Sequence, residues 1–96
     1  MTMLITMSKI GAKLDSRPSG REAFLAMQPT IRAVKEEETL TLDFSGVDLL
    51  TPSFADEFVT PLVETYGKKR VELRNTQSNA SVRETLAFLS EGWAKD

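Results

Sequence analysis

The chain has 96 residues, of which 41% are hydrophobic and 27% are charged, a balance typical of one ordinary folded domain. Its formal net charge of -2 disfavours non-specific nucleic-acid binding, which needs clustered Lys and Arg. Because Cys and His are both absent, disulfides, thiolate nucleophiles and the commonest general base and zinc ligand are excluded. No stretch approaches the ~20 apolar residues of a membrane span. We therefore expect a single cytoplasmic domain over residues 1–96 that binds no cofactor, metal, membrane or nucleic acid.

The first third of the chain predicts a strand and an interrupted helix. Met3–Met7 is a short apolar run suited to a strand, whereas residues 9–14 fit either a second short strand or a loop. Ser19 and Glu22 have the spacing of a capping box, which predicts the start of a helix. The apolar residues that follow at helical spacing are Phe24, Met27, Ile31 and Val34. Pro29 removes a backbone donor from this segment, so a kink or an early stop is expected.

The middle of the chain has the clearest pattern. Residues 39–44 alternate strictly between apolar and polar side chains, which predicts a strand with its leucines facing the core. Ser45–Gly46 marks a turn, and Thr51–Pro52 combines a helix N-cap with a proline in the first helical position. The apolar stripe that follows at helical spacing consists of Phe54, Ala55, Phe58, Val59, Leu62, Val63 and Tyr66. Gly67 is expected to cap the end of this helix, and Pro61 is expected to bend it.

The last third predicts one more strand and one more helix. Residues 69–75 alternate again, and Ser81 with Glu84 repeats the capping-box spacing. The apolar face of the last helix consists of Val82, Leu86, Leu89 and Trp93. Gly92 is expected to end this helix. Strands that alternate with helices imply crossover connections, so the predicted fold is a two-layer α/β domain, with a parallel or mixed sheet and helices mainly on one face.

The carboxyl ends of the predicted strands define the region where a site is expected. In a sheet of this kind, the loops that leave these ends gather along one edge, where ligands usually bind. The three loops span residues 11–20, 45–53 and 75–81. The middle loop brings the hydroxyls of Thr51 and Ser53 to a helix start, where unpaired amides and the helix dipole favour a phosphate group.

Residues 42–57, LDFSGVDLLTPSFADE, resemble the signature of bacterial STAS-like domains of unknown function. The resemblance extends upstream to Gly11 and Ser16–Gly20 and downstream to Gly67 and Val71–Asn75, so it covers most of the chain. More distantly, the chain is similar to the anti-sigma-factor antagonists, in which a strand and turn deliver a phosphorylatable serine to a helix start. The resemblance implies a non-enzymatic regulatory domain with a protein partner, such as a GHKL-type serine kinase or ATPase.

The phosphorylation site of the antagonists does not carry over directly. Their loop ends in an Asp-Ser-Ser-Gly pattern, and superposition places Thr51 on the aspartate, Pro52 on the phosphorylated serine and Ser53 on the next serine. Ser53 could take the phosphate instead, but Asp56 and Glu57 lie one turn further on and would repel it. Phosphorylation of Ser53 or Thr51 is therefore left open.

Two sets of residues form the candidate sites, and neither is catalytic. The predicted partner-binding set is Asp43, Thr51, Ser53, Phe54, Asp56 and Glu57. In the alternative function, a small-ligand or nucleotide sensor, an anion would contact Arg17, Gly20 and Arg21. A purely structural role competes at several positions, because capping explains Thr51 and a turn explains Asp43. A catalytic role is disfavoured by the missing His and Cys, and a homodimer is left open because so short a chain buries a modest core.

Overall fold

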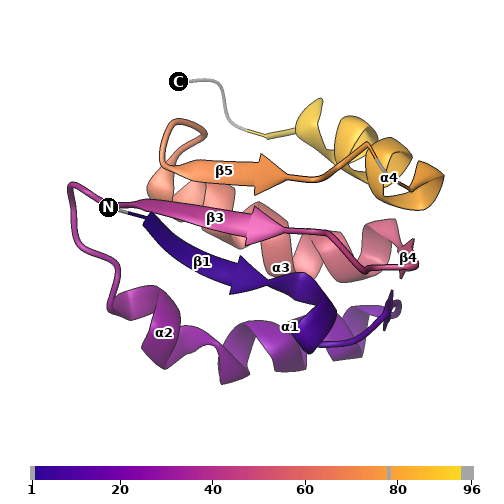
Figure 1. The fold of residues 1–96 in the computed structure, drawn as a ribbon, viewed down its shortest axis with the longest axis horizontal. Helices are drawn as coiled ribbons and strands as arrows, with labels where there is room; N and C mark the ends of the chain where they lie inside the picture. The colour runs from indigo at the N-terminus through magenta and orange to yellow at the C-terminus, as the bar shows by residue number, and fades with distance from the viewer. Residues whose placement is uncertain (1, 78, 94–96) are drawn as a thin grey trace.

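The order of the elements follows the predicted alternation of strands and helices (Figure 1). The computed structural model describes residues 2–77 and 79–93. In chain order the elements are β1 (Thr2–Thr6), the 3-10 helix η1 (Met7–Lys9), β2 (Lys13–Leu14), α1 (Arg17–Ala26), α2 (Gln28–Arg32), β3 (Thr39–Asp43), β4 (Leu49–Leu50), α3 (Pro52–Tyr66), β5 (Val71–Arg74) and α4 (Ala80–Ser90). Helix α3, with 15 residues, carries most of the predicted partner-binding set.

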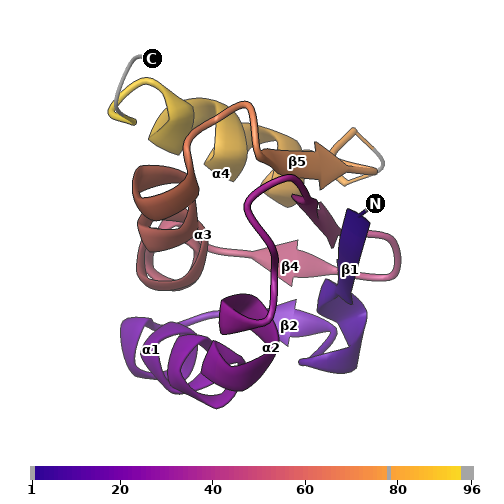
Figure 2. The same ribbon diagram turned by 90° about the vertical axis from the view of Figure 1, so that its left-hand side faces the viewer.

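Three strands form a parallel sheet in the order β1-β3-β5, with β3 in the centre. Leu42 of β3 pairs with Ile5 of β1 and with Leu73 of β5, which fixes the register of the sheet. The short strands β2 and β4 form a second parallel pair. The helices lie to one side of the three-stranded sheet, and α3 lies between α1 and α4 (Figure 2). The predicted α/β fold, with a parallel sheet and helices on one face, is confirmed.

The hydrophobic core lies between this sheet and α3. Leu40, Leu42 and Phe44 are almost fully buried, as the alternation of their segment predicts. The residues of α3 that are buried against the core are Phe54, Ala55, Phe58, Val59, Leu62 and Val63. Thr41 points to the opposite face of β3 but is buried as well, and its Oγ1 donates a hydrogen bond to Oε1 of Glu72 at 3.2 Å. Because β3 is the central strand, Thr41 has a paired strand on each side. The sequence pattern alone does not predict this burial.

Both predicted capping boxes are wrong, because the true caps lie further upstream. Ser16 caps α1: its Oγ accepts a hydrogen bond from the backbone N–H of Ser19 at 3.2 Å. Asn79 caps α4: its Oδ1 accepts from the backbone N–H groups of Ser81 and Val82 at 2.8 and 3.3 Å. Ser and Asn are both among the preferred capping residues, and spacing alone does not decide which of several candidates begins the helix.

Proline has different effects in the two helical segments that contain it. Met27 separates α1 from α2, so the predicted early stop is confirmed, and Pro29 occupies the first turn of α2. Pro61 lies inside α3, which continues through it as one helix. Gly67 caps α3 as predicted: its N–H donates to the carbonyl of Val63 at 2.8 Å, and its φ of 88° is a conformation that favours glycine.

The shortest elements are the ones that the sequence pattern describes least well. Residues 9–14 contain β2, which was one of two alternatives for this segment. Strand β4 was expected to be part of a loop, and a strand of two residues is too short to show a period. Helix α4 ends at Ser90, before Gly92, where its end was expected.

We expect Leu42→Ala to lower the free energy of unfolding by about 2 to 5 kcal/mol, because it leaves a cavity beside the central strand of the sheet. Leu42 is 0% exposed. Urea unfolding followed by far-ultraviolet circular dichroism measures this loss. Leu25→Ala is the matched control, since Leu25 on α1 is 59% exposed and should change stability little. A loss below about 1 kcal/mol for Leu42→Ala would contradict the assignment of this strand face.

Candidate functional site

The three loops at the carboxyl edge of the sheet converge as predicted. The backbone N–H of Thr51 donates to the carbonyl of Leu14 at 3.0 Å, which joins the first loop to the second. Asn79 Nδ2 donates to the carbonyl of Asp48 at 2.7 Å, which joins the second loop to the third. These hydrogen bonds link segments that are more than thirty residues apart in the sequence and place the start of α3 among all three loops.

Thr51 begins α3 in the predicted way. Its Oγ1 accepts a hydrogen bond from the backbone N–H of Phe54 at 3.3 Å, and Pro52 follows in the first helical position. The same hydroxyl donates to the carbonyl of Leu14 at 3.5 Å. The Thr51 hydroxyl therefore donates one hydrogen bond and accepts another within the fold, and both bonds hold the helix start in place.

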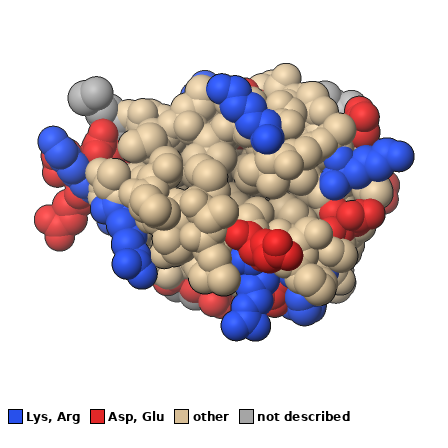
Figure 3. Space-filling view, turned by 90° about the horizontal axis from the view of Figure 1, so that it is seen from below, with Lys and Arg blue, Asp and Glu red and all other residues tan. Residues whose placement is uncertain are grey.

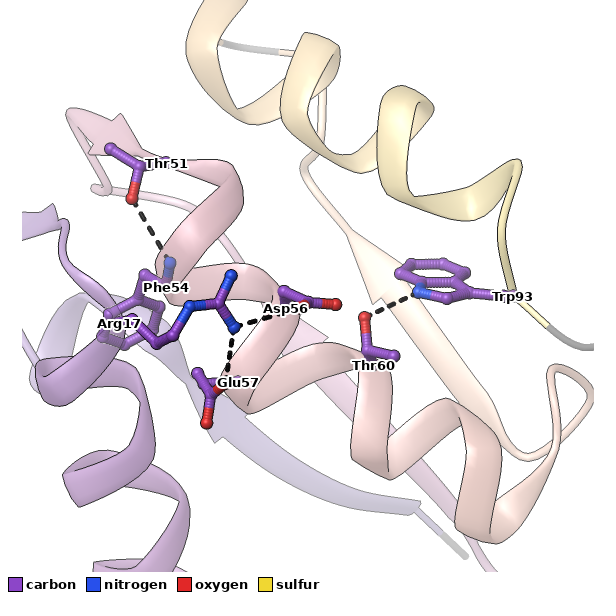
Figure 4. Close-up of polar contacts among 7 residues, drawn as sticks. All are labelled: Arg17, Thr51, Phe54, Asp56, Glu57, Thr60 and Trp93. Carbon is purple, nitrogen blue, oxygen red and sulfur yellow. Dashed lines mark hydrogen bonds and ion pairs between the residues drawn. The ribbon is translucent and has the colours of Figure 1, made fainter.

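Arg17, at the start of α1, reaches across to the first turns of α3 (Figure 4). Its Nη1 bonds to a carboxylate oxygen of Glu57 and, at 3.2 Å, to Oδ2 of Asp56. The bond to Glu57, and to a smaller extent the bond to Asp56, raises the pKa of the Arg17 guanidinium above its ordinary value. The three side chains stay partly exposed, at 53% for Arg17, 41% for Asp56 and 27% for Glu57. The predicted partner-binding and anion-binding sets therefore meet in one ion-pair cluster.

The residues of the predicted anion-binding set, Arg17, Gly20 and Arg21, all lie in the first turns of α1. Gly20 is buried against α3, and a Cβ on it would lie 2.6 Å from the backbone carbonyl oxygen of Phe54. Gly20 therefore allows α1 and α3 to approach closely, which is a packing role. Arg17 is held by two carboxylates, and Arg21 is exposed on α1. An incoming anion would have to compete with Asp56 and Glu57 for the Arg17 guanidinium.

Phe54 is a core residue, although it was predicted to contact a partner. Its side chain is 1% exposed, and its ring stacks on that of Phe58 with 6.0 Å between centroids. Phe58 in turn meets the edge of Phe24 from α1 at 6.4 Å. The buried ring of Phe54 therefore holds the start of α3 against the core, and its side chain leaves almost no surface for a partner to contact.

Asp43 ties the end of the central strand to its neighbour. Its Oδ1 accepts hydrogen bonds from Asn75 Nδ2 at 2.7 Å and from the backbone N–H of Ser45 at 2.9 Å. Both bonds lower the pKa of the Asp43 carboxyl below its ordinary value, and the bond from Asn75 has the larger effect. Asp43 therefore has the structural role that was one of its two predicted roles, because its carboxylate fixes the turn at Ser45.

The remaining polar residues at the helix start are the partly exposed Arg17, Ser53, Asp56 and Glu57, which we call the α1–α3 cluster. Ser53 is half-buried in the first turn of α3, one helical turn before Asp56 and Glu57, so it lies on the same side of the helix. Within residues 2–77 and 79–93, no group of three or more His, Cys, Asp or Glu residues could hold a metal ion. No helix in these same ranges is long and apolar enough to cross a membrane.

A groove between α3 and α4, with a volume of about 480 Å³, was missed by the sequence analysis. Its lining residues are Asp56, Thr60, Glu64, Phe88, Leu89, Glu91, Gly92 and Trp93. Trp93 is a core residue as predicted, 7% exposed, and its Nε1 donates to Thr60 Oγ1 at 2.8 Å (Figure 4). Phe88 is 64% exposed. The sequence does indicate the exposure of Phe88, because this residue lies outside the apolar face formed by Val82, Leu86, Leu89 and Trp93.

The fold and the site together define a small parallel α/β domain in which loops converge on a polar helix start. The model of a family described as STAS-like domain of unknown function (DUF4325) matches residues 30–80. The match covers more than half of the chain, so the chain belongs to this family of STAS-like domains. The matched part includes β3, β4, α3 and β5 and thus the start of α3. No curated protein and no solved structure matches the chain significantly.

We expect Gly20→Ala to destabilise the domain by about 1 to 3 kcal/mol, because the added methyl group would push α1 and α3 apart. Its nearest contact would be a backbone oxygen at 2.6 Å, which cannot move without shifting α3. Chemical denaturation of the variant measures the loss. Gly92→Ala is the matched control, since a Cβ there would meet the carbonyl oxygen of Leu89 at an ordinary 3.7 Å. Equal stability of the two variants would contradict the close approach at Gly20.

We expect the stabilising effect of Asp43 to depend on pH. Its pKa is lower in the folded state than in the unfolded chain, so its contribution is present above the unfolded value and is lost as the pH falls through the folded value. The urea midpoints of the wild type and of Asp43→Ala should therefore differ at neutral pH and converge in acid. Asn75→Ala, which removes the main cause of the shift, should raise the pKa of Asp43 in a carboxyl NMR titration. A constant difference between midpoints at every pH would contradict this role.

Proposed function

We propose that this domain is a non-enzymatic regulatory module that binds a protein partner through the α1–α3 cluster. The observation that carries the proposal is the set of exposed charges that two distant segments bring together at the start of α3. The backbone beneath these charges is held by the Thr51 cap and by the burial of Phe54. A surface whose geometry is fixed before binding loses little conformational entropy when a partner contacts it.

Several observations favour protein binding over catalysis. The chain has no His or Cys, and the hydroxyl of Thr51 is occupied by bonds to the backbone. The carboxylates of Asp56 and Glu57 are engaged in ion pairs with Arg17. A small-ligand sensor is supported less well, because Gly20 is engaged in packing and Arg17 in ion pairing.

The nature of the partner follows from the family and from the charge distribution. The distant similarity to anti-sigma-factor antagonists favours a cytoplasmic partner of the GHKL-type serine kinase or ATPase class. On the face shown in Figure 3, Lys and Arg side chains lie apart from one another and among Asp and Glu. A nucleic-acid backbone would need a continuous basic surface, so this distribution supports a protein partner instead.

Arg17 also bears on the regulation that we propose for this surface. A phosphate on Ser53 would be repelled by Asp56 and Glu57, but the guanidinium of Arg17 lies between these two carboxylates and compensates part of their charge. Ser53 is therefore the residue of the cluster at which a kinase partner would act. The side chain that occupies the acceptor position of the antagonists, Pro52, has no hydroxyl.

We expect Ser53→Glu and Asp56→Arg each to weaken partner binding by at least about tenfold, because both change the charge of the cluster without touching the core. The tagged domain first identifies its partner by copurification from its native host, and calorimetry with the purified partner then gives the affinities. Each variant should change the stability by less than about 1 kcal/mol, as is usual for exposed sites. Glu84→Arg, an exposed charge reversal on α4, is the matched control and should leave the affinity unchanged.

The proposal fails if Ser53→Glu and Asp56→Arg both fold normally and both keep the affinity within twofold. The start of α3 would then serve the fold alone. Residues 16–21, which form the adjacent exposed start of α1, would become the better candidate for the partner surface.

A further inference from the structure

The groove between α3 and α4 combines an exposed aromatic ring with carboxylates. Phe88 is the most exposed of the large hydrophobic residues in the described part of the chain, at 64%. Leu89 and Trp93 line the groove beside it, and the indole of Trp93 is held by its hydrogen bond to Thr60. An aromatic side chain left in water next to other apolar groups favours contact with another molecule.

In residues 2–77 and 79–93, all the charged residues that line this groove are negative. The acidic lining residues are Asp56 and Glu64 of α3 and Glu91 at the end of α4, and none of the described lining residues is Lys or Arg. Helix α3 contains no basic residue anywhere in its 15 positions. Arg17 compensates part of the charge of Asp56, but it approaches from the side of α1 (Figure 4). The groove therefore keeps a net negative charge around its apolar residues.

We propose that this groove docks an amphipathic basic segment of a partner protein. The apolar side chains of such a segment would cover Phe88, and its Lys or Arg side chains would pair with Glu64 and Glu91. A neutral apolar occupant would bury carboxylates without a counter-charge, which is unfavourable. A second copy of this chain would bring a formal net charge of -2 toward the same carboxylates.

This inference rests on the proposed role in protein binding, but it concerns a different surface. The α1–α3 cluster lies on the side of α3 that faces α1, whereas the groove lies on the side that faces α4. Asp56 is the residue shared by the two surfaces. Variants at Phe88 or Glu64 therefore test the groove alone, and a variant at Ser53 tests the cluster alone.

Trp93 provides a direct measurement of occupancy. It is the single tryptophan of the chain, and it lines the groove. Two synthetic peptides without tryptophan serve as probes: one places Leu on one helical face and Lys on the other, and the second carries Glu in place of every Lys. We expect the basic peptide to change the emission of Trp93 saturably and the acidic peptide to leave it unchanged. Added salt should weaken the binding, because exposed charges are screened.

Point variants connect this signal to the groove. Phe88→Ala should weaken binding of the basic peptide by at least about tenfold, as truncation of a central aromatic contact usually does. Glu64→Gln combined with Glu91→Gln should weaken binding and reduce its dependence on salt. Leu25→Ala removes an equally exposed hydrophobic residue from α1 and is the matched control, which should bind like the wild type. Ser53→Glu should also bind like the wild type, even if it abolishes binding at the α1–α3 cluster.

Four results would overturn the proposal. The first is the absence of saturable binding by the basic peptide, and the second is equal binding of the acidic one. The third is a Phe88→Ala variant that keeps the affinity within twofold. The fourth is a dimer in sedimentation experiments that Phe88→Ala dissociates, because the occupant of the groove would then be a second copy of this chain.

Discussion

The close approach of α1 to α3 at Gly20 is the contact on which the rest of the site depends. A hydrogen atom instead of a side chain lets the backbone of α1 lie against the carbonyl of Phe54. This approach places Arg17 within reach of the carboxylates of α3 and closes the core over the ring of Phe54. A larger residue at position 20 would push α1 away from α3 and would also move Arg17 away from Asp56 and Glu57. The packing of the two helices and the ion pairs on their surface therefore depend on the same contact.

Helix α3 gives the domain its core and both of its candidate surfaces. Its inner face is buried under the sheet, one flank meets α1 at the ion pairs of Arg17, and the other flank meets α4 at the groove. Asp56 lies where the two flanks meet. Because a packed helix moves as a rigid unit, a partner that shifts α3 from one flank would alter the geometry of the other. The two proposed surfaces therefore share one element.

The features predicted from the sequence are those that local patterns determine. The alternation of residues 39–44 and the cap at Thr51 with Pro52 are short-range signals, and the structure bears both out. The cap of α4 was misplaced because Asn79 and Ser81 both suit a helix start. The pairing of Arg17 with Asp56 and Glu57 joins residues 39 and 40 positions apart, and no local pattern contains such a contact. The groove beside Phe88 was missed because residues of both α3 and α4 line it, and no local pattern contains such a pairing.

The charge of the proposed surfaces does not depend on pH near neutrality. The chain has no histidine, so it lacks the side chain whose ordinary pKa lies between about pH 5 and 8. The charges of the α1–α3 cluster belong to one guanidinium and two carboxylates, which pair with one another. Binding through them would respond to salt rather than to pH. A change in covalent charge, which we propose at Ser53, and competition between partners for α3 would both regulate these surfaces without a change in pH.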